Sequence, residues 1–145
     1  MPIIFEIIDN KKPLTNDQYD ILTYFTGVFE VCNKESLKSV ISYFISQFGN
    51  ECNLNWIDTS EITDMSHLFD NSKFNGDVSK WNVSNVTNMK YMFSWCKNFN
   101  GDISNWDVSN VTNMQGMFET CAFNGDISNW DVSNVTNMYW LFFSS

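Results

Sequence analysis

A nine-residue phrase recurs along this chain with a period of 24 or 25 residues. WNVSNVTNM begins at Trp81, and WDVSNVTNM begins at Trp106 and again at Trp130. A weaker copy, WIDTSEITDM, begins at Trp56. A unit this short cannot enclose a hydrophobic core alone, so the copies must stack and bury one another. The sequence therefore predicts an N-terminal cap over residues 1–55 and a repeat region over 56–145, with rungs at 56–80, 81–105, 106–129 and a partial rung at 130–145.

The predicted cap is helical. Apolar residues at helical spacing follow Thr15, which begins a capping box with Gln18, so a helix is expected in the segment LTNDQYDILTYFTGVFEVC. A second helix is expected between Asn33, as its N-cap, and Gly49. The apolar run Ile3–Ile8 is a candidate strand. Such a cap would cover the apolar end of the first rung, although a separate recognition module is the alternative.

Each rung mixes two periodicities. Trp106 and Val108 alternate around a polar residue, as in a strand with one buried face. From Met114 to Phe123 the apolar spacing suits a short helix or a 3₁₀ segment, and FNGD then forms a tight turn. This order predicts an α/β solenoid, a leucine-rich-repeat-like coil of about four short rungs built from parallel strands and short helices.

Stacked rungs would place tryptophan and cysteine residues in files along the repeat. A tryptophan buries about 150–250 Å², which makes this file the largest apolar contribution to a core, although an exposed platform for sugar rings is the alternative. Cys96 and Cys121 share one slot, which favours buried thiols over a disulfide between rungs. The single histidine has no counterpart in the other rungs, so no metal site is predicted. The files are Trp56, Trp81, Trp106 and Trp130, and Cys96 and Cys121.

The charge balance excludes the usual nucleic-acid partners. Eight lysines and no arginine stand against 17 acidic residues, which gives a formal charge of −9, whereas phosphate backbones require clustered cations. The N-terminus lacks the basic region and cleavage site of a secretory signal, and no run approaches the ~18 apolar residues of a membrane span. We therefore expect no membrane span and no export signal, and the compartment stays open.

The repeat resembles that of BspA-like leucine-rich-repeat surface proteins, and more closely a related repeat of mycoplasma-type lipoproteins. The shared elements are WDVSNVTNM, MF, C and FNGDIS, and they extend from Trp56 to Ser145. The resemblance implies a right-handed solenoid with short parallel strands on its concave side. It also implies adhesion or protein–protein contact, without enzymatic activity.

Repeated polar side chains offer two candidate sites. Asp77, Asp102 and Asp126 follow Asn-Gly in three rungs, so they could bind calcium between rungs or accept backbone N–H bonds at their own turns. The second candidate is a polar strip for a protein partner, made of side chains that flank the tryptophans and should point outward where the tryptophans point inward. An ordinary solvated face is the alternative. The strip comprises Lys80, Asn82, Asn105, Asp107, Asn129 and Asp131.

The chain ends in MYWLFFSS, part-way through its fourth rung. Trp140, Leu141, Phe142 and Phe143 then form either a lid or an open apolar end, and an open end invites self-association. Truncation of a longer protein is the competing explanation of this end. No nucleophile is paired with a base and no cofactor motif occurs, so no enzymatic activity is predicted. The leading hypothesis is a non-enzymatic interaction or adhesion module that binds a protein through the polar strip. The alternative is a structural component that self-associates through its C-terminal end.

Overall fold

The computed structural model describes residues 31–145, and one helix, α3 (Lys34–Phe48), opens this part of the chain. Asn33 caps the helix in a reciprocal capping box with Ser36, and Gly49 ends it with φ of 83°. Both ends of this helix were predicted correctly. The helix predicted after Thr15 and the strand predicted at Ile3–Ile8 lie outside the described residues, and the domain boundary at residue 56 stays a prediction.

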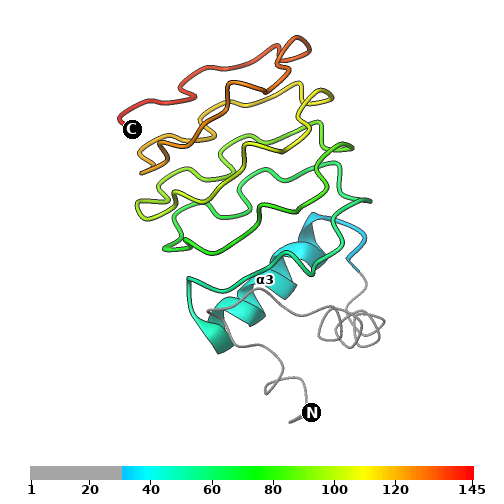
Figure 1. The fold of residues 1–145 in the computed structure, drawn as a ribbon, viewed down its shortest axis with the longest axis vertical. Coiled ribbons are helices and arrows are strands. Elements are labelled where there is room, and N and C mark those ends of the chain that lie inside the picture. The colour runs from blue at the N-terminus through cyan, green and yellow to red at the C-terminus, as the bar shows by residue number, and fades with distance from the viewer. Residues whose placement is uncertain (1–30) are drawn as a thin grey trace.

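Helix α3 lies across one end of the repeat region (Figure 1). Its apolar face packs on the first repeat, where the ring centroids of Phe44 and Trp56 are 4.4 Å apart. Lys34 Nζ donates to the side chains of Asp64 and Ser66, both at 3.1 Å. The helix therefore covers one end of the stack, in the manner that a capping element requires. The buried face comprises Leu37, Val40, Ile41 and Phe44.

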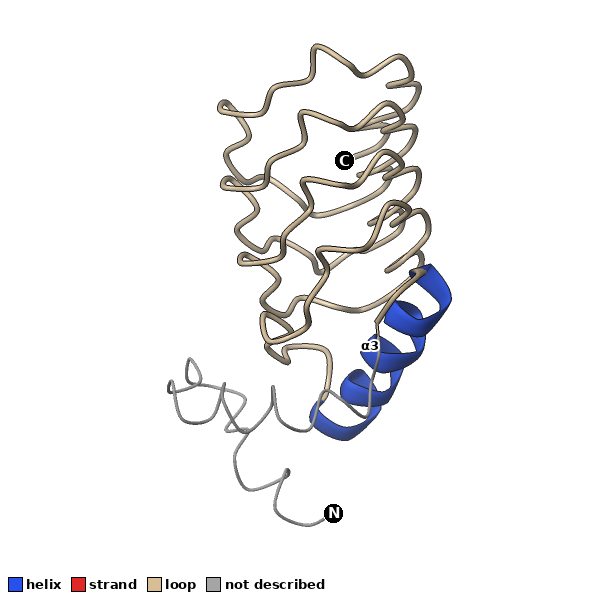
Figure 2. Ribbon diagram, turned by 90° about the vertical axis from the view of Figure 1, so that its right-hand side faces the viewer, coloured by secondary structure: helices blue, strands red, loops and turns tan. Residues whose placement is uncertain are grey.

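After α3 the chain winds through successive coils that stack on one another, and the C-terminus lies at the end opposite the helix (Figures 1 and 2). Within residues 31–145 the coils contain no strand and no second helix. Neighbouring coils meet at isolated parallel bridges: Asn53 with Asp77, Asp64 with Asn88, Asn88 with Asn113, and Asn113 with Asn137. The prediction of an α/β leucine-rich-repeat-like solenoid, with parallel strands and short helices in each rung, is therefore wrong.

Local turns explain why the expected strand is absent. The N–H of Trp106 donates to Ile103 O at 3.2 Å, and that of Val111 donates to Val108 O at 2.9 Å. Between these turns, Asp107 Oδ1 accepts the N–H of Ser109 at 3.1 Å. Asp, Asn and Ser side chains compete in this way with ladder hydrogen bonds. The backbone thus turns too often to extend a ladder beyond single bridges.

The expected short helix is also absent, because alternate N–H groups donate to a neighbouring coil and not to carbonyls within their own. The N–H groups of Met114, Gly116, Phe118 and Thr120 donate to carbonyls of the next coil at 2.8–3.0 Å. Gly116 and Thr120 have positive φ, at 58° and 51°, and right-handed helices exclude that conformation. The segment is a repeated non-helical turn.

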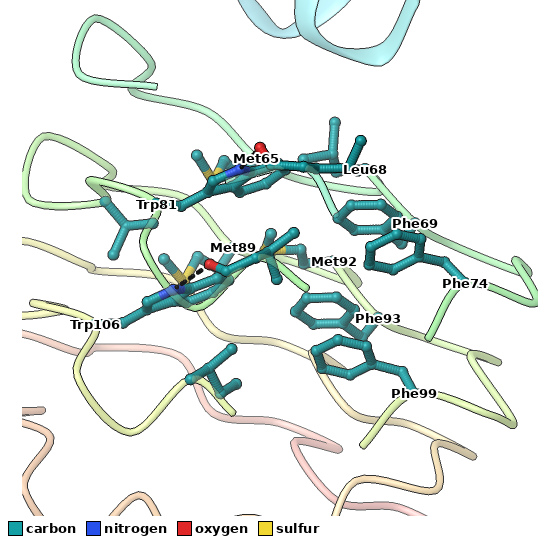
Figure 3. Packing of buried hydrophobic residues seen from close by; sticks show 14 of the residues in the cluster. Met65, Leu68, Phe69, Phe74, Trp81, Met89, Met92, Phe93, Phe99 and Trp106 are labelled. Carbon is teal, nitrogen blue, oxygen red and sulfur yellow. Dashed lines mark hydrogen bonds between the residues drawn. The ribbon is translucent and has the colours of Figure 1, made fainter. Parts of the chain in front are cut away.

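Stacked aromatic rings form the core, and Figure 3 shows two successive layers of it. Trp81 and Trp106 lie 6.5 Å apart with their planes 3° from parallel. The indoles of Trp81, Trp106 and Trp130 also donate Nε1 to a backbone carbonyl earlier in the chain, as Trp106 does to Val78 O at 3.1 Å. The prediction that the tryptophan file belongs to the core is confirmed. The phenylalanine file stacks likewise, through Phe69, Phe93, Phe118 and Phe142.

Candidate functional site

The six residues of the predicted polar strip are all exposed, and they fall in two slots of successive coils. One slot forms turns: Asn82, Asp107 and Asp131 each accept, through Oδ1, the N–H of the serine two residues later, at 3.0–3.1 Å. The other slot comprises Lys80, Asn105 and Asn129. Half of the strip therefore stabilises the local backbone.

The three aspartates considered for calcium have the same kind of role. Asp77, Asp102 and Asp126 each accept, through Oδ1, the N–H of the serine two residues later, at 2.9–3.0 Å. Within residues 31–145, no three His, Cys, Asp or Glu side chains come together in a group that could hold a metal ion. The geometry favours the turn role that the sequence left open.

These turns lower the pKa of their carboxyl groups. Hydrogen bonds from the hydroxyl and the N–H of Ser109 hold the pKa of Asp107 below its ordinary range, and Ser133 does the same for Asp131. The pKa is lower in the folded state than the ordinary value of about 3.9. The turns therefore stabilise the fold above that pH, and this contribution is lost as the pH falls through the lowered pKa. Asn82 makes the same bonds to Ser84 without a titrating group.

We therefore expect the Asp107→Asn/Asp131→Asn variant to lose less stability in acid than the unmodified chain. Urea midpoints at pH 7 and at about pH 2.5, below the ordinary pKa of aspartate, measure the difference. Glu61→Gln is the control, because that exposed carboxylate is not part of a serine turn. An equal loss in the double variant and the unmodified chain would show that these turns do not cause the acid sensitivity.

The cysteines within the stack are buried free thiols. Cys52, Cys96 and Cys121 form no disulfide. Burial raises the pKa of Cys52 to about 11 and that of Cys96 to about 12. Because the thiolate is the reactive form, these thiols are inert near neutral pH. They pack as small apolar residues, as the shared slot of Cys96 and Cys121 predicted.

The C-terminal end of the stack exposes large apolar side chains. Tyr139 is 62 % exposed, Phe143 55 %, Phe142 46 % and Trp140 44 %, whereas Phe118, which occupies the slot of Phe142 one coil earlier, is fully buried. Of the four residues predicted for self-association, Trp140, Phe142 and Phe143 are exposed, and Leu141 is partly buried against the core. We call the exposed group the end surface: Val132, Met138, Tyr139, Trp140, Phe142 and Phe143.

The backbone of the end surface presents hydrogen-bond donors that sequence reasoning did not detect. In each earlier coil, four alternate N–H groups donate to the next coil, as Met89, Tyr91, Phe93 and Trp95 do at 2.8–2.9 Å. The corresponding N–H groups of the last coil have no hydrogen-bond partner among residues 31–145. We call these four groups the donor row: Met138, Trp140, Phe142 and Ser144.

An open hollow of about 540 Å³ lies beside the end surface. Phe123 and Ile127 line it from the third repeat, and Phe142 and Ser145 line it from the fourth. The remaining lining residues are Cys121, Ala122, Asn124 and Gly125. Apolar rings, backbone donors and this hollow therefore meet at one end of the molecule.

The described part of the chain is thus a repeat protein of stacked coils, covered by a helix at one end and open at the other. No helix in it is both long and apolar enough to cross a membrane. The chain belongs to the family described as Mycoplasma protein of unknown function, DUF285, whose model matches residues 35–145. This family is related to BspA-like surface repeat proteins. No curated protein and no solved structure matches the chain.

Proposed function

We propose that this protein is a non-enzymatic interaction module that binds a protein partner through its end surface. The observation that carries the proposal is the exposure of Tyr139, Trp140, Phe142 and Phe143 together at one end. Aromatic side chains dominate the binding energy of protein interfaces, and contiguous exposed apolar patches mark interaction sites in soluble proteins. Surface adhesion of the BspA-like kind is one form that such binding would take.

The polar strip is the weaker candidate for the partner surface. Asp107 and Asp131 already bind the backbone of their own turns, so a partner would compete with those bonds. Its six residues include no aromatic or arginine side chain, and these are the types enriched at binding hot spots. The strip therefore serves as the comparison surface in the experiment.

Affinity capture with three forms of the chain tests the proposal. We expect the Phe142→Ser/Phe143→Ser variant to lose the protein that the unmodified chain retains, because it removes two exposed rings from the end surface. The matched variant Asn105→Lys/Asn129→Lys alters the strip alone and should retain that protein. Thermal melts of all three forms check folding, because Phe142 also stacks on Phe118 at 5.4 Å.

The opposite pattern, retention by the serine variant and loss by the lysine variant, would show that the polar strip is the partner surface and the end surface is not. Light scattering over a concentration series separates a foreign partner from self-association. A mass that rises with concentration for the unmodified chain, and stays at one chain for Phe142→Ser/Phe143→Ser, would identify the retained protein as a second copy.

A further inference from the structure

We propose that the end surface binds an extended polypeptide segment that carries this same repeat, added in parallel as one further coil. The inference rests on the proposed function and names the chemistry of its partner. It follows from the hydrogen-bonding groups of the end surface, from the shape of the adjoining hollow and from the cover at the opposite end of the stack.

The donor row requires a partner with carbonyl groups at alternate positions. Within the stack, a coil meets this requirement with the segment that begins at VTNM, as when Asn137 O, Tyr139 O, Leu141 O and Phe143 O accept from the preceding coil at 2.8–3.0 Å. A side chain or a water molecule could satisfy one such donor. Four donors at two-residue spacing match an extended backbone.

The same end also presents acceptors, and these match other residues of the repeat. In the preceding layer, Asn100 Oδ1 accepts the N–H of Asn124 at 2.8 Å, and Ile103 O accepts Trp130 Nε1 at 3.1 Å. Ser109 O accepts Asn134 Nδ2 at 2.7 Å, and Thr112 O accepts the N–H of Thr136 at 2.9 Å. The corresponding acceptors of the end are Asn124 Oδ1, Ile127 O, Ser133 O and Thr136 O.

Two of these groups select side chains of the occupant. Ile127 O matches the indole Nε1 of the Trp of WDVSNVTNM, and Ser133 O matches the Nδ2 of the Asn in its SNV portion. Asn124 Oδ1 matches a backbone N–H, which any residue except proline supplies. The hollow beside Phe123 has room for the phenylalanine of FNGDIS, since Phe99 and Phe123 already stack at 6.1 Å in the layer below. A generic apolar peptide would leave most of these groups unpaired, at a cost of about 1–3 kcal/mol for each group that it buries.

A second intact copy of this chain does not meet the requirement. Its first coil is covered by α3, where Lys38 Nζ donates to His67 O at 3.3 Å and Lys34 Nζ holds Asp64. Two end surfaces facing each other would place one donor row against another. The occupant is therefore a repeat segment whose carbonyl side is not already covered by a helix.

A synthetic peptide of residues 96–120, labelled with fluorescein, is the probe, because it holds FNGDIS, the tryptophan phrase and the following MF in one 25-residue segment. We expect saturable binding by fluorescence anisotropy, and none with a scrambled peptide. The Asn124→Ala variant should bind the peptide about threefold to tenfold more weakly, because it removes one hydrogen bond from the interface. Asn98→Ala, an exposed asparagine on the side of the stack, should bind unchanged.

Amide hydrogen exchange gives the second readout. The N–H groups of Met138, Trp140, Phe142 and Ser144 should gain protection when the peptide is bound, because each becomes a donor to it. Equal binding of the scrambled peptide, an unchanged affinity in Asn124→Ala, or no added protection at the donor row would overturn the proposal. Absence of peptide binding, with partner capture still dependent on Phe142 and Phe143, would overturn this inference and leave the proposed function standing.

Discussion

Replacing Trp106 with alanine should lower the free energy of unfolding by about 3–5 kcal/mol, the usual cost of truncating a large buried aromatic residue. The indole is 3 % exposed, and its ring lies 6.5 Å from that of Trp81 and 6.2 Å from that of Phe93. The variant also loses the bond from Nε1 to Val78 O. Because these partners all belong to preceding repeats, the variant loses ring packing and a hydrogen bond at the same interface. Urea denaturation followed by circular dichroism measures the change.

Two further variants separate the causes of this loss. Trp106→Phe keeps an aromatic ring in the stack and removes the hydrogen bond, so a loss of about 1–2 kcal/mol is expected. Trp95→Ala removes an indole that is 47 % exposed, and a loss below about 1 kcal/mol is expected because exposed sites tolerate substitution. Equal losses at Trp95 and Trp106 would contradict the assignment of the tryptophan file to the core.

Gly76→Ala should lower the free energy of unfolding by at least about 2 kcal/mol, in the range measured for overpacked sites. A Cβ at this position would overlap the carbonyl oxygen of Cys52. That oxygen belongs to the backbone and accepts the N–H of Asp77 at 3.2 Å. The clash therefore cannot be relieved by rotating a side chain, and the turn must move away from the preceding layer.

Gly101 provides a matched control, because it occupies the same place in the next FNGD turn. A Cβ there would meet the Phe99 ring at 3.0 Å and Gly76 O at 3.3 Å. Small shifts relieve such contacts, so Gly101→Ala should cost about 1 kcal/mol or less. Thermal melts of the two variants give the comparison. Similar losses would show that the two turns have equal clearance, contrary to the structure.

The repeat predicted the core well because burial follows from stacking alone. Once the copies lie over one another, the residues that recur as Trp, Val, Met and Phe have only the neighbouring copies to pack against. Trp81, Val83, Met89 and Phe93 are accordingly all buried. Helix α3 could be predicted equally well, because Asn33 and Gly49 are local signals for its two ends and the apolar spacing between them is regular.

The backbone conformation of the coils could not be predicted in the same way. Alternation around Asp107 resembles a strand, but the side chain of Asp107 competes for the backbone of its own turn. Positive φ at Tyr91 and Trp95 is also invisible in the sequence, since neither residue type favours that conformation. These angles are maintained by bonds to the next coil, so they depend on a neighbour distant in sequence.

The candidate site was predicted in part. The phrase YWLFF indicated an apolar end, and the structure exposes most of it. The sequence does not indicate that the unpaired backbone groups at this end are N–H donors. The same side chains could lie beside unpaired N–H groups or beside unpaired carbonyl groups. The alternation around the tryptophans indicates which side chains of the polar strip point outward, but it does not indicate that half of them accept hydrogen bonds from their own turns.

Among residues 31–145, helix α3 covers one end of the stack and leaves the other uncovered, and this asymmetry gives these coils a direction of unfolding. Each coil is held only by the layers beside it, so the array behaves as a linear chain of neighbours in which loss of order spreads from an uncovered end. The last coil should open most often, and protection from exchange should rise layer by layer toward the helix. A molecule bound at the open end would then slow the unzipping of the whole array, although it touches only the last layers.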